Sequence, residues 1–357
     1  MINSPIDNRQ STIRTINPTP FFFAVLSIVA FYYSGLNLQF VANEVIIRVV
    51  RNSLLVLALV IPVIAGMGLN FSIIIGAMCA QAGWIIMLDL KVPGIYGISG
   101  AVFSGVIISI ICGYAIGTYL NRVKGREMIA TIIIGILGAG IYEFIFLVGY
   151  GSFIRSHNSE MLLSRGVGIR DMVDLAPYRN IIDKLWLMDI HGIEFPLFML
   201  FIAGIAAVVL KFMLSTRLGQ QFRAVGIDRM SAELAGINTD NTRIKAIIIS
   251  TVFACLGQII FLQNIGMVNV YTAHMNSDIF SCAAILAGGA TIREAKIRHV
   301  FIGIFLFHSL YIVTPQAGQN MFANAALGEY FRSFIAYGSI AMAILLNIRV
   351  ERQKANT

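Results

Sequence analysis

Long apolar segments recur along this chain, and they exclude most soluble folds. Residues 94–120 contain no charged side chain, and residues 128–148 contain only Glu143. Each run matches or exceeds the roughly 20 residues that a helix needs to cross the hydrocarbon core of a bilayer. Charged residues make up 12% of the 357 residues, about half of the roughly 25% found in soluble domains. We therefore expect an all-α, polytopic membrane helix bundle.

About ten transmembrane segments are expected between residues 21 and 348, and they form one transmembrane domain. Residues 1–20 and 349–357 are predicted to be cytoplasmic tails, and residues 41–51 to lie at the membrane interface. The expected spans are residues 21–36, two segments within 52–88, then 94–120, 128–148, 195–212, 244–261, 279–286, 300–313 and 330–347.

The basic loops support this topology. Lys and Arg concentrate in residues 122–126, 215–245 and 293–298 and after residue 348, which the positive-inside tendency places in the cytoplasm. This bias also explains the net charge of +8 without a nucleic-acid partner. Residues 149–194 mix both signs of charge, and we expect them to form an external loop with short surface helices.

Glycines mark two further features. Residues 52–88 are interrupted by Pro62, Gly66, Gly68 and Asn70. The interruption is either a helix break that lines a cavity or a tight turn at the membrane surface, and the sequence favours neither. Gly113 and Gly117 are spaced as a helix-packing face.

A few polar residues lie within the apolar segments and are candidates for a translocation path: Asn70, Gln81, Glu143 and His308. An intramembrane carboxylate suggests a function by default, although Glu143 could also form a structural pair. Asn70 and Gln81, like Gln258, could equally join neighbouring helices. For His308 we favour a hydrogen-bonded core histidine over a proton relay.

Residues 215–245 form a polar connector between two apolar runs, and we call them the coupling segment. Asp228 is suited to cap a short helix at residues 229–235, because its carboxylate can accept hydrogen bonds from free backbone amides. Met230 and Leu234 then lie on one face of that helix, and Gly236 is suited to the left-handed position that ends it. The pattern fits either an ordinary solvated loop or a docking element.

Two motifs lie in the C-terminal half of the chain. The first consists of Arg217-Leu218-Gly219, Arg223-Ala224-Val225-Gly226, Ala232 and Ala235-Gly236-Ile237-Asn238, and the second of Ala283-Ala284-Ile285-Leu286-Ala287-Gly288-Gly289-Ala290-Thr291. Both motifs resemble one permease family, the membrane subunits of bacterial ABC importers for ribose, nucleosides and branched-chain amino acids. The second motif departs from the family pattern, because Arg293-Glu294-Ala295-Lys296 follows where further glycines are usual. The N-terminal half is similar mainly in hydropathy.

The resemblance implies a subunit of the bacterial inner membrane that forms the path for a small polar solute, a sugar or a nucleoside, with a branched-chain amino acid as the alternative. Its implied partners are ABC ATPase subunits, a second permease subunit in a homodimer or heterodimer, an external solute-binding protein and the lipid bilayer. ATP would be used by the partner subunits, and no cofactor is expected on this chain. The residues expected to contact or position the ATPase are Arg217, Arg223, Gly226, Asp228, Arg229, Met230, Ala232, Glu233 and Gly236.

Enzymatic motifs are missing from the sequence. It has no GxxxxGK[ST] phosphate loop, HExxH zinc motif, EF-hand or GxSxG, so we expect neither catalysis nor a metal site. The competing hypothesis is an ion-coupled secondary transporter, which would depend on intramembrane carboxylates or broken helices. Glu143 and the interruption near Gly66 are the features that favour it.

Overall fold

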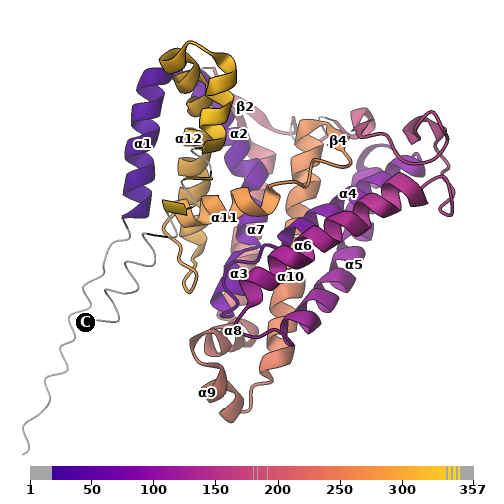
Figure 1. The fold of residues 1–357 in the computed structure, drawn as a ribbon, viewed down its shortest axis with the longest axis vertical. Coiled ribbons are helices and arrows are strands. Elements are labelled where there is room, and N and C mark those ends of the chain that lie inside the picture. Colours follow the sequence, from indigo (N-terminus) through magenta and orange to yellow (C-terminus); the bar gives the residue numbers. More distant parts are fainter. Residues whose placement is uncertain are drawn as a thin grey trace, which may run out of the picture.

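The computed structural model is a bundle of long, tilted helices (Figure 1). It describes residues 18–334 except 180, 183 and 191, and also 337–338, 341–342 and 345. The predicted C-terminal tail, residues 1–17 of the predicted N-terminal tail and eight of the 18 residues of the predicted span 330–347 therefore lie outside the described residues. Within the described part, five helices are long and apolar enough to cross a membrane: α5 (Gly94–Leu120), α6 with the turn after it (Glu127–Gly149), α7 (Leu197–Ser215), α10 (Thr239–Ile265) and α12 (Ile297–Phe322).

Three shorter apolar helices complete most of the predicted pattern: α1 (Thr19–Ser34), α4 (Ile73–Asp89) and α11 (Ser277–Ala287). The helix α2 (Leu38–Leu57) is long enough to span but carries three charged residues, Glu44, Arg48 and Arg51. The mostly helical bundle is thus confirmed, and the number of ten spans stays a prediction.

The helix α10 forms the centre of the bundle and packs against α2, α4 and α5. In its most apolar stretch 61% of the residues are buried, against 22% in α6 and in α7, so α6 and α7 present their apolar surface to lipid. The predicted packing face of α5 is confirmed. A Cβ on Gly113 would lie 2.9 Å from Ile248 Cα, and one on Gly117 would lie 2.9 Å from Ile244 Cα.

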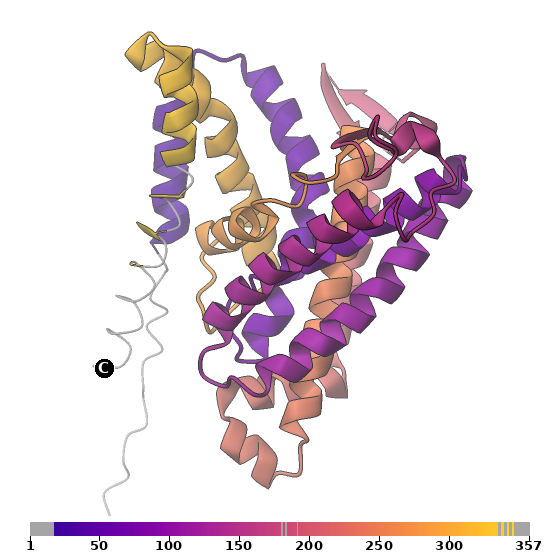
Figure 2. The same cartoon turned by 45° about the vertical axis from the view of Figure 1, so that its right-hand side comes forward.

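The interruption in residues 52–88 is a turn at one end of the bundle. After α2 the short helix α3 (Val60–Ile64) leads into residues 65–72, and α4 then runs back along the bundle. Gly66 and Gly68 have φ angles of 75° and 72°, which suit glycine. The turn packs against α8 (Arg217–Ile227) of the coupling segment at the lower end of the bundle in Figures 1 and 2.

Two predicted boundaries are wrong. Residues 41–51 belong to α2, which begins after Asn37, whose side chain accepts a hydrogen bond from the Gln39 amide at 2.9 Å. The predicted span 300–313 is too short, because α12 continues through Pro315 as far as Phe322.

The described part of segment 149–194 contains short helices, as expected, but these are 3-10 helices, and it also contains strands that the sequence analysis does not predict. The 3-10 helices are Ser159–Met161 and Ala176–Tyr178. Strand β1 (Met172–Asp174) pairs antiparallel with β4 (Met267–Asn269), which follows α10, and β2 (Leu187–Ile190) pairs with β3 (Ile193–Pro196). The β1–β4 ribbon lies at the end of the bundle opposite to α8 and α9 (Arg229–Leu234).

Candidate functional site

The helix α8 is amphipathic and packs one face on the bundle. Phe222 is fully buried and Val225 is 5% exposed, with Leu218 partly buried beside them. Gly226 brings the backbone into direct contact with the end of α3, since a Cβ on Gly226 would lie 2.1 Å from the carbonyl oxygen of Ile64. The apolar face and the close approach fix α8 to the bundle.

The helix α9 begins and ends where the sequence predicts, within one residue. The Asp228 carboxylate accepts hydrogen bonds from the Met230 amide at 3.0 Å and from the Ser231 amide at 3.3 Å. Gly236 has a φ angle of 81°, and the Ile237 amide donates back to the Ala232 carbonyl oxygen at 3.0 Å, which completes a C-terminal cap.

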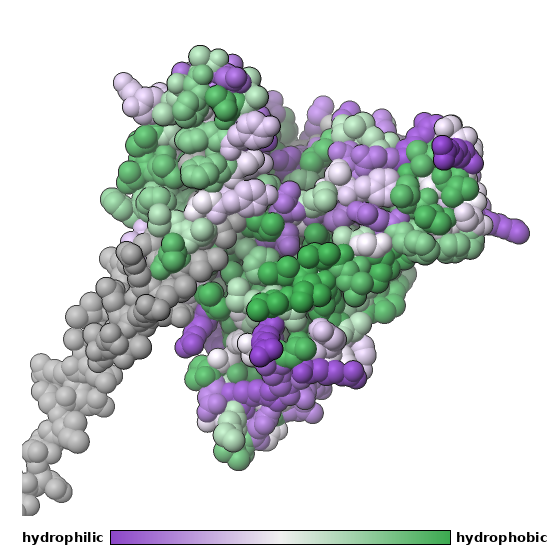
Figure 3. All heavy atoms as spheres, viewed as in Figure 1, coloured by the Kyte–Doolittle hydropathy of each residue, from purple (hydrophilic) through white to green (hydrophobic). Residues whose placement is uncertain are grey.

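The outer face of this helix pair is apolar and uncovered. Ile227, Met230 and Leu234 are 87%, 74% and 85% exposed. Figure 3 shows that hydrophilic residues otherwise dominate this end of the molecule, below the hydrophobic middle of the bundle. Exposed large apolar side chains on a charged surface mark a site for protein contact.

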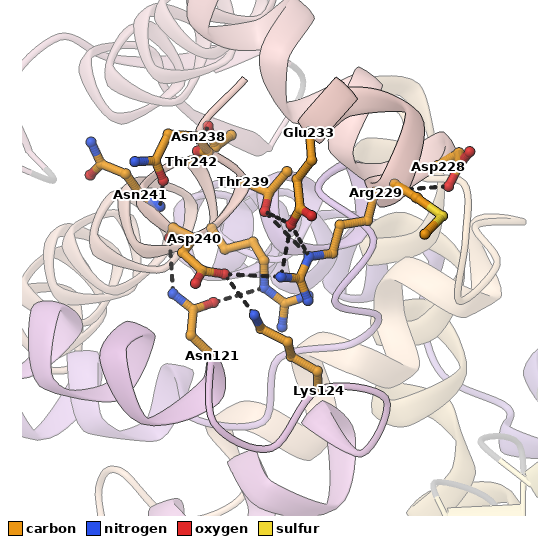
Figure 4. Close-up of polar contacts among 12 residues, drawn as sticks. Asn121, Lys124, Asp228, Arg229, Glu233, Asn238, Thr239, Asp240, Asn241 and Thr242 are labelled. Carbon is orange, nitrogen blue, oxygen red and sulfur yellow. Dashed lines mark hydrogen bonds and ion pairs between the residues drawn. The ribbon is translucent and has the colours of Figure 1, made fainter. Parts of the chain in front are cut away.

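Charged side chains tie α9 to the loop between α5 and α6 (Figure 4). Arg229 pairs with Glu233 at 2.9 Å and with Asp240 at 3.3 Å, and Asp240 also pairs with Lys124 at 2.9 Å. Beneath them Arg243, only 6% exposed in its side chain, contacts Glu127 at 2.6 Å. The coupling segment is therefore joined to α5, α6 and α10 by one connected set of polar contacts.

The two carboxylates of α9 have pKa values below their ordinary range. The Ser231 hydroxyl and the Met230 amide donate to Asp228, which lowers its pKa. The Thr239 hydroxyl and then Arg229 lower the pKa of Glu233. Both groups are ionised at neutral pH, so the cap and the ion pairs are present there.

The structure divides the predicted coupling residues into two groups. Arg217, Arg223 and Met230 are exposed and free to meet a partner. The others shape the segment itself, through backbone contact, capping, burial or internal ion pairs: Gly226, Asp228, Arg229, Ala232, Glu233 and Gly236.

Of the four predicted path residues, His308 lines an internal cavity. This cavity of about 100 Å³ lies between α2, α10, α11 and α12. His308 is 6% exposed, and its Nδ1 has no hydrogen-bond partner in the described part of the chain. That contradicts the expected hydrogen-bonded core histidine at this atom. The other polar residues of the lining are Asn52, Gln258, Ser277 and Ser281.

The remaining three predicted path residues are separate from one another. Asn70 is buried in the turn after α3, where its amide donates to the Ser250 hydroxyl at 3.2 Å. Gln81 is fully buried in α4, and Glu143 is exposed on α6. The structure thus supports an interhelical role for Asn70 and does not group the four residues into one path.

A loop after α10 closes the cavity on the side of the β1–β4 ribbon, and we call residues 266–276 the lid. Gln258 Nε2 donates to the Ala273 carbonyl oxygen at 2.9 Å, and His274 Nδ1 lies 3.0 Å from Gln81 Oε1. His274 is 1% exposed. Burial lowers the pKa of His274 to about 4, so the ring is neutral.

The lid is held from outside by residues 169–175. Besides the β1–β4 pairing, the Val270 amide donates to the Asp171 carbonyl oxygen at 2.6 Å, and the Tyr271 hydroxyl donates to the Ile169 carbonyl oxygen at 2.8 Å. No local sequence pattern indicates this contact. Asn52 and the serines of the cavity were also missed, although isolated polar residues within apolar runs were a usable signal.

Comparisons with known proteins agree with the helical bundle. The family model described as "Branched-chain amino acid transport system / permease component" matches residues 41–346. The xylose transport system permease protein XylH of Haemophilus influenzae is 25% identical over 217 residues, which cover 58% of this chain and 56% of that relative. The aligned part is therefore just over half of the relative's length. No solved structure matches the chain.

Proposed function

The chain belongs to the permease-component family of branched-chain amino acid transport systems, and we propose that it forms the path of an ATP-driven importer for a sugar or nucleoside. As a member of this family it is a transport subunit of an ABC system. A sugar is supported by the similarity to a xylose permease. A branched-chain amino acid is the alternative solute.

The uncovered apolar face of Ile227, Met230 and Leu234 carries this proposal. These three side chains protrude at one end of the bundle, on helices that are rigidly seated. We infer that they insert into a groove on an ABC ATPase subunit, with Arg217 and Arg223 on its polar surface. This end then faces the cytoplasm of a bacterium, and a homologous or identical second permease completes the complex.

The internal contacts give a route for movement from the ATPase to the path. A push on α9 acts on the α5–α6 loop through Asp240 and Lys124, and a push on α8 acts on the turn after α3 through Gly226. Both α5 and the α2–α4 region pack on the central α10. Its Gln258 lines the cavity and holds the lid.

At the opposite end, residues 149–194 provide the landing surface for an external solute-binding protein. This segment holds the lid through the β1–β4 ribbon, so a protein that displaces it can open the cavity from outside. The cavity lining is mixed: amide, hydroxyl and imidazole groups lie beside Phe261 and Phe280. Such a lining suits a neutral hydroxylated solute better than an ion.

Co-purification tests the proposal. The chain is expressed with the ATPase encoded beside it and assayed for complex formation and ATP hydrolysis. Leu234→Glu should abolish the complex, because a carboxylate would replace an apolar anchor, whereas Met188→Glu on the exposed strand β2 should leave it intact. Solute flux by the chain alone, without any ATPase complex, would instead identify a secondary transporter.

A further inference from the structure

A second, larger cleft opens where α3, α7 and α8 meet the segment before α12. Its volume is about 810 Å³, and its walls come from Ile64, from residues 207–214 of α7, from residues 223–227 of α8 and from residues 293–298. The last wall contains the Arg293–Lys296 sequence that departs from the family pattern. The proposed function uses two of the lining residues, Arg223 and Ile227, for contact with the ATPase, and a third, Gly226, for contact with the turn after α3. It assigns nothing to the rest of the cleft.

Cations dominate the lining. It contains Lys211, Arg223, Arg293, Lys296 and Arg298 but a single acid, Glu294. Glu294 pairs with Lys296 at 2.5 Å. Among the described residues, no carboxylate lies within ion-pair distance of the other four cations. Four positive charges around one hollow are suited to a bound anion.

One wall of the cleft is the apolar surface of a helix long enough to cross a bilayer. This wall lies on α7 and includes Val208, which is 65% exposed. Lys211 follows on the same face and is one turn from the end of α7 at Ser215. A lysine at this depth can lay its aliphatic stem along apolar surface and place its ammonium group in the headgroup region.

We propose that this cleft binds one anionic phospholipid, with the phosphate among the four cations and an acyl chain along Val208. The combination favours a lipid over other anions. A soluble phosphate would make no use of the apolar wall, and an acidic protein segment would need no wall from a helix long enough to cross a bilayer. Basic pockets between membrane helices on the cytoplasmic side are known to hold such headgroups.

The position of the cleft gives the lipid a role in coupling. Arg223 and Gly226 belong to α8, and Arg293 and Arg298 flank the start of α12. A headgroup held by both walls would join the coupling segment to the connection between α11 and α12. The lipid proposal rests on the proposed function in one respect, that the α8–α9 end faces the cytoplasm. Lipid binding itself is measured on this chain without the ATPase.

Native mass spectrometry of the purified chain tests the site, with phosphatidylglycerol and phosphatidylcholine of identical acyl chains as probes. The wild type should retain one phosphatidylglycerol in preference to phosphatidylcholine, and glycerol phosphate should not displace it. Arg293→Gln with Arg298→Gln should weaken retention roughly thirtyfold, since each of the two cations contributes about 1 kcal/mol near the surface. Arg293→Lys with Arg298→Lys should restore it.

A matched control separates this site from general surface charge. Arg122→Gln with Lys245→Gln removes two exposed cations at the same end of the bundle but outside the cleft, and should leave retention unchanged. Equal retention of both lipids, or an equal loss in the control, would overturn the proposal. The proposal would also be overturned if the wild type bound a second copy of the chain in place of lipid and the cleft variant lost that copy. A missing ATPase complex would count against the proposed function and leave this result standing.

Discussion

The two ends of the bundle hold their surface segments by different chemistry. At the α8–α9 end, α9 is held mainly by exposed charged side chains: Lys124 and Asp240 pair at 2.9 Å with 34% and 51% of their side chains exposed. At the β1–β4 end most contacts are made by backbone groups and by neutral buried side chains, such as Gln81 and His274 at 3.0 Å, and one carboxylate takes part, since Asp171 accepts a hydrogen bond from the Tyr271 amide at 3.1 Å.

This difference suggests different tasks. Exposed ion pairs contribute only about 0–1 kcal/mol each, so a docking ATPase can rearrange them at little cost. A buried neutral hydrogen bond costs about 1–3 kcal/mol when one partner is left unsatisfied. The α8–α9 end is therefore built to exchange contacts, and the lid end is built to stay shut until its backbone ribbon moves.

The largest expected effect concerns the one buried ion pair at the α8–α9 end among the described residues. Arg243→Ala would leave Glu127 as an unpaired charge in a buried site and should lower the free energy of unfolding by about 3–5 kcal/mol. Chemical unfolding in mixed micelles measures this. Arg243→Leu combined with Glu127→Leu should recover most of the loss. If Arg243→Ala were as stable as the wild type, this ion pair would not contribute to the stability of the α8–α9 end.

A change of pH should affect the lid first. The pKa of folded His274 is about 4, below its ordinary 6.5, so the stabilisation is complete above pH 6.5 and is lost as the pH falls toward 4. By linkage, about 2 kcal/mol is lost between pH 7 and pH 5. The pKa values of Asp228 and Glu233 are lowered, so both carboxylates stay ionised until the pH falls below the range in which carboxyl groups ordinarily titrate. The helix α9 should therefore not respond between pH 7 and pH 5.

Hydrogen exchange at pH 7 and pH 5, corrected for intrinsic rates, measures both ends in one sample. The lid amides should lose protection while those of residues 229–237 keep theirs. His274→Gln, which cannot be protonated, should remove the pH response of the lid. Equal loss at both ends would show that the two ends open as one unit.

The smallest expected effect is that of salt. Between about 0.1 M and 1 M the screening length falls from about 10 Å to about 3 Å, so the exposed pairs around Asp240 should weaken. Protection of α9 should fall by less than about fivefold, because each such pair contributes under about 1 kcal/mol. The β1–β4 ribbon should be unaffected, and Asp240→Asn should reduce the response of α9. If salt lowered the protection of the β1–β4 ribbon more than that of α9, the proposed difference between the two ends would be wrong.

The sequence was informative wherever the determining signal is local. The bounds of α5 were predicted residue for residue, since an uncharged run lies between Pro93 and Asn121. The cap of α9 was predicted from Asp228 and Gly236, because both act on their own neighbours. The β1–β4 pairing, in contrast, joins residues about a hundred positions apart, and no local pattern indicates it.

Charge also misled the prediction where tertiary contacts compensate it. Residues 41–51 read as interfacial because of Arg48 and Arg51. In the fold Arg48 pairs with Glu44 at 3.4 Å, and the Arg51 guanidinium lies 5.0 Å from the centre of the Phe261 ring. The burial of His274 likewise depends on a contact with Gln81, which is distant in sequence.

The contact between Gly66 and Gly226 has a mechanical consequence. A Cβ on Gly66 would lie 2.8 Å from the Gly226 Cα, so two backbones meet without an intervening layer of side chains. Side chains can change rotamer and absorb a small displacement, whereas touching backbones have little compliance. A shift of α8 by a fraction of an ångström is therefore passed to the α3–α4 turn almost undiminished. Even a methyl group at either position would push the two backbones apart.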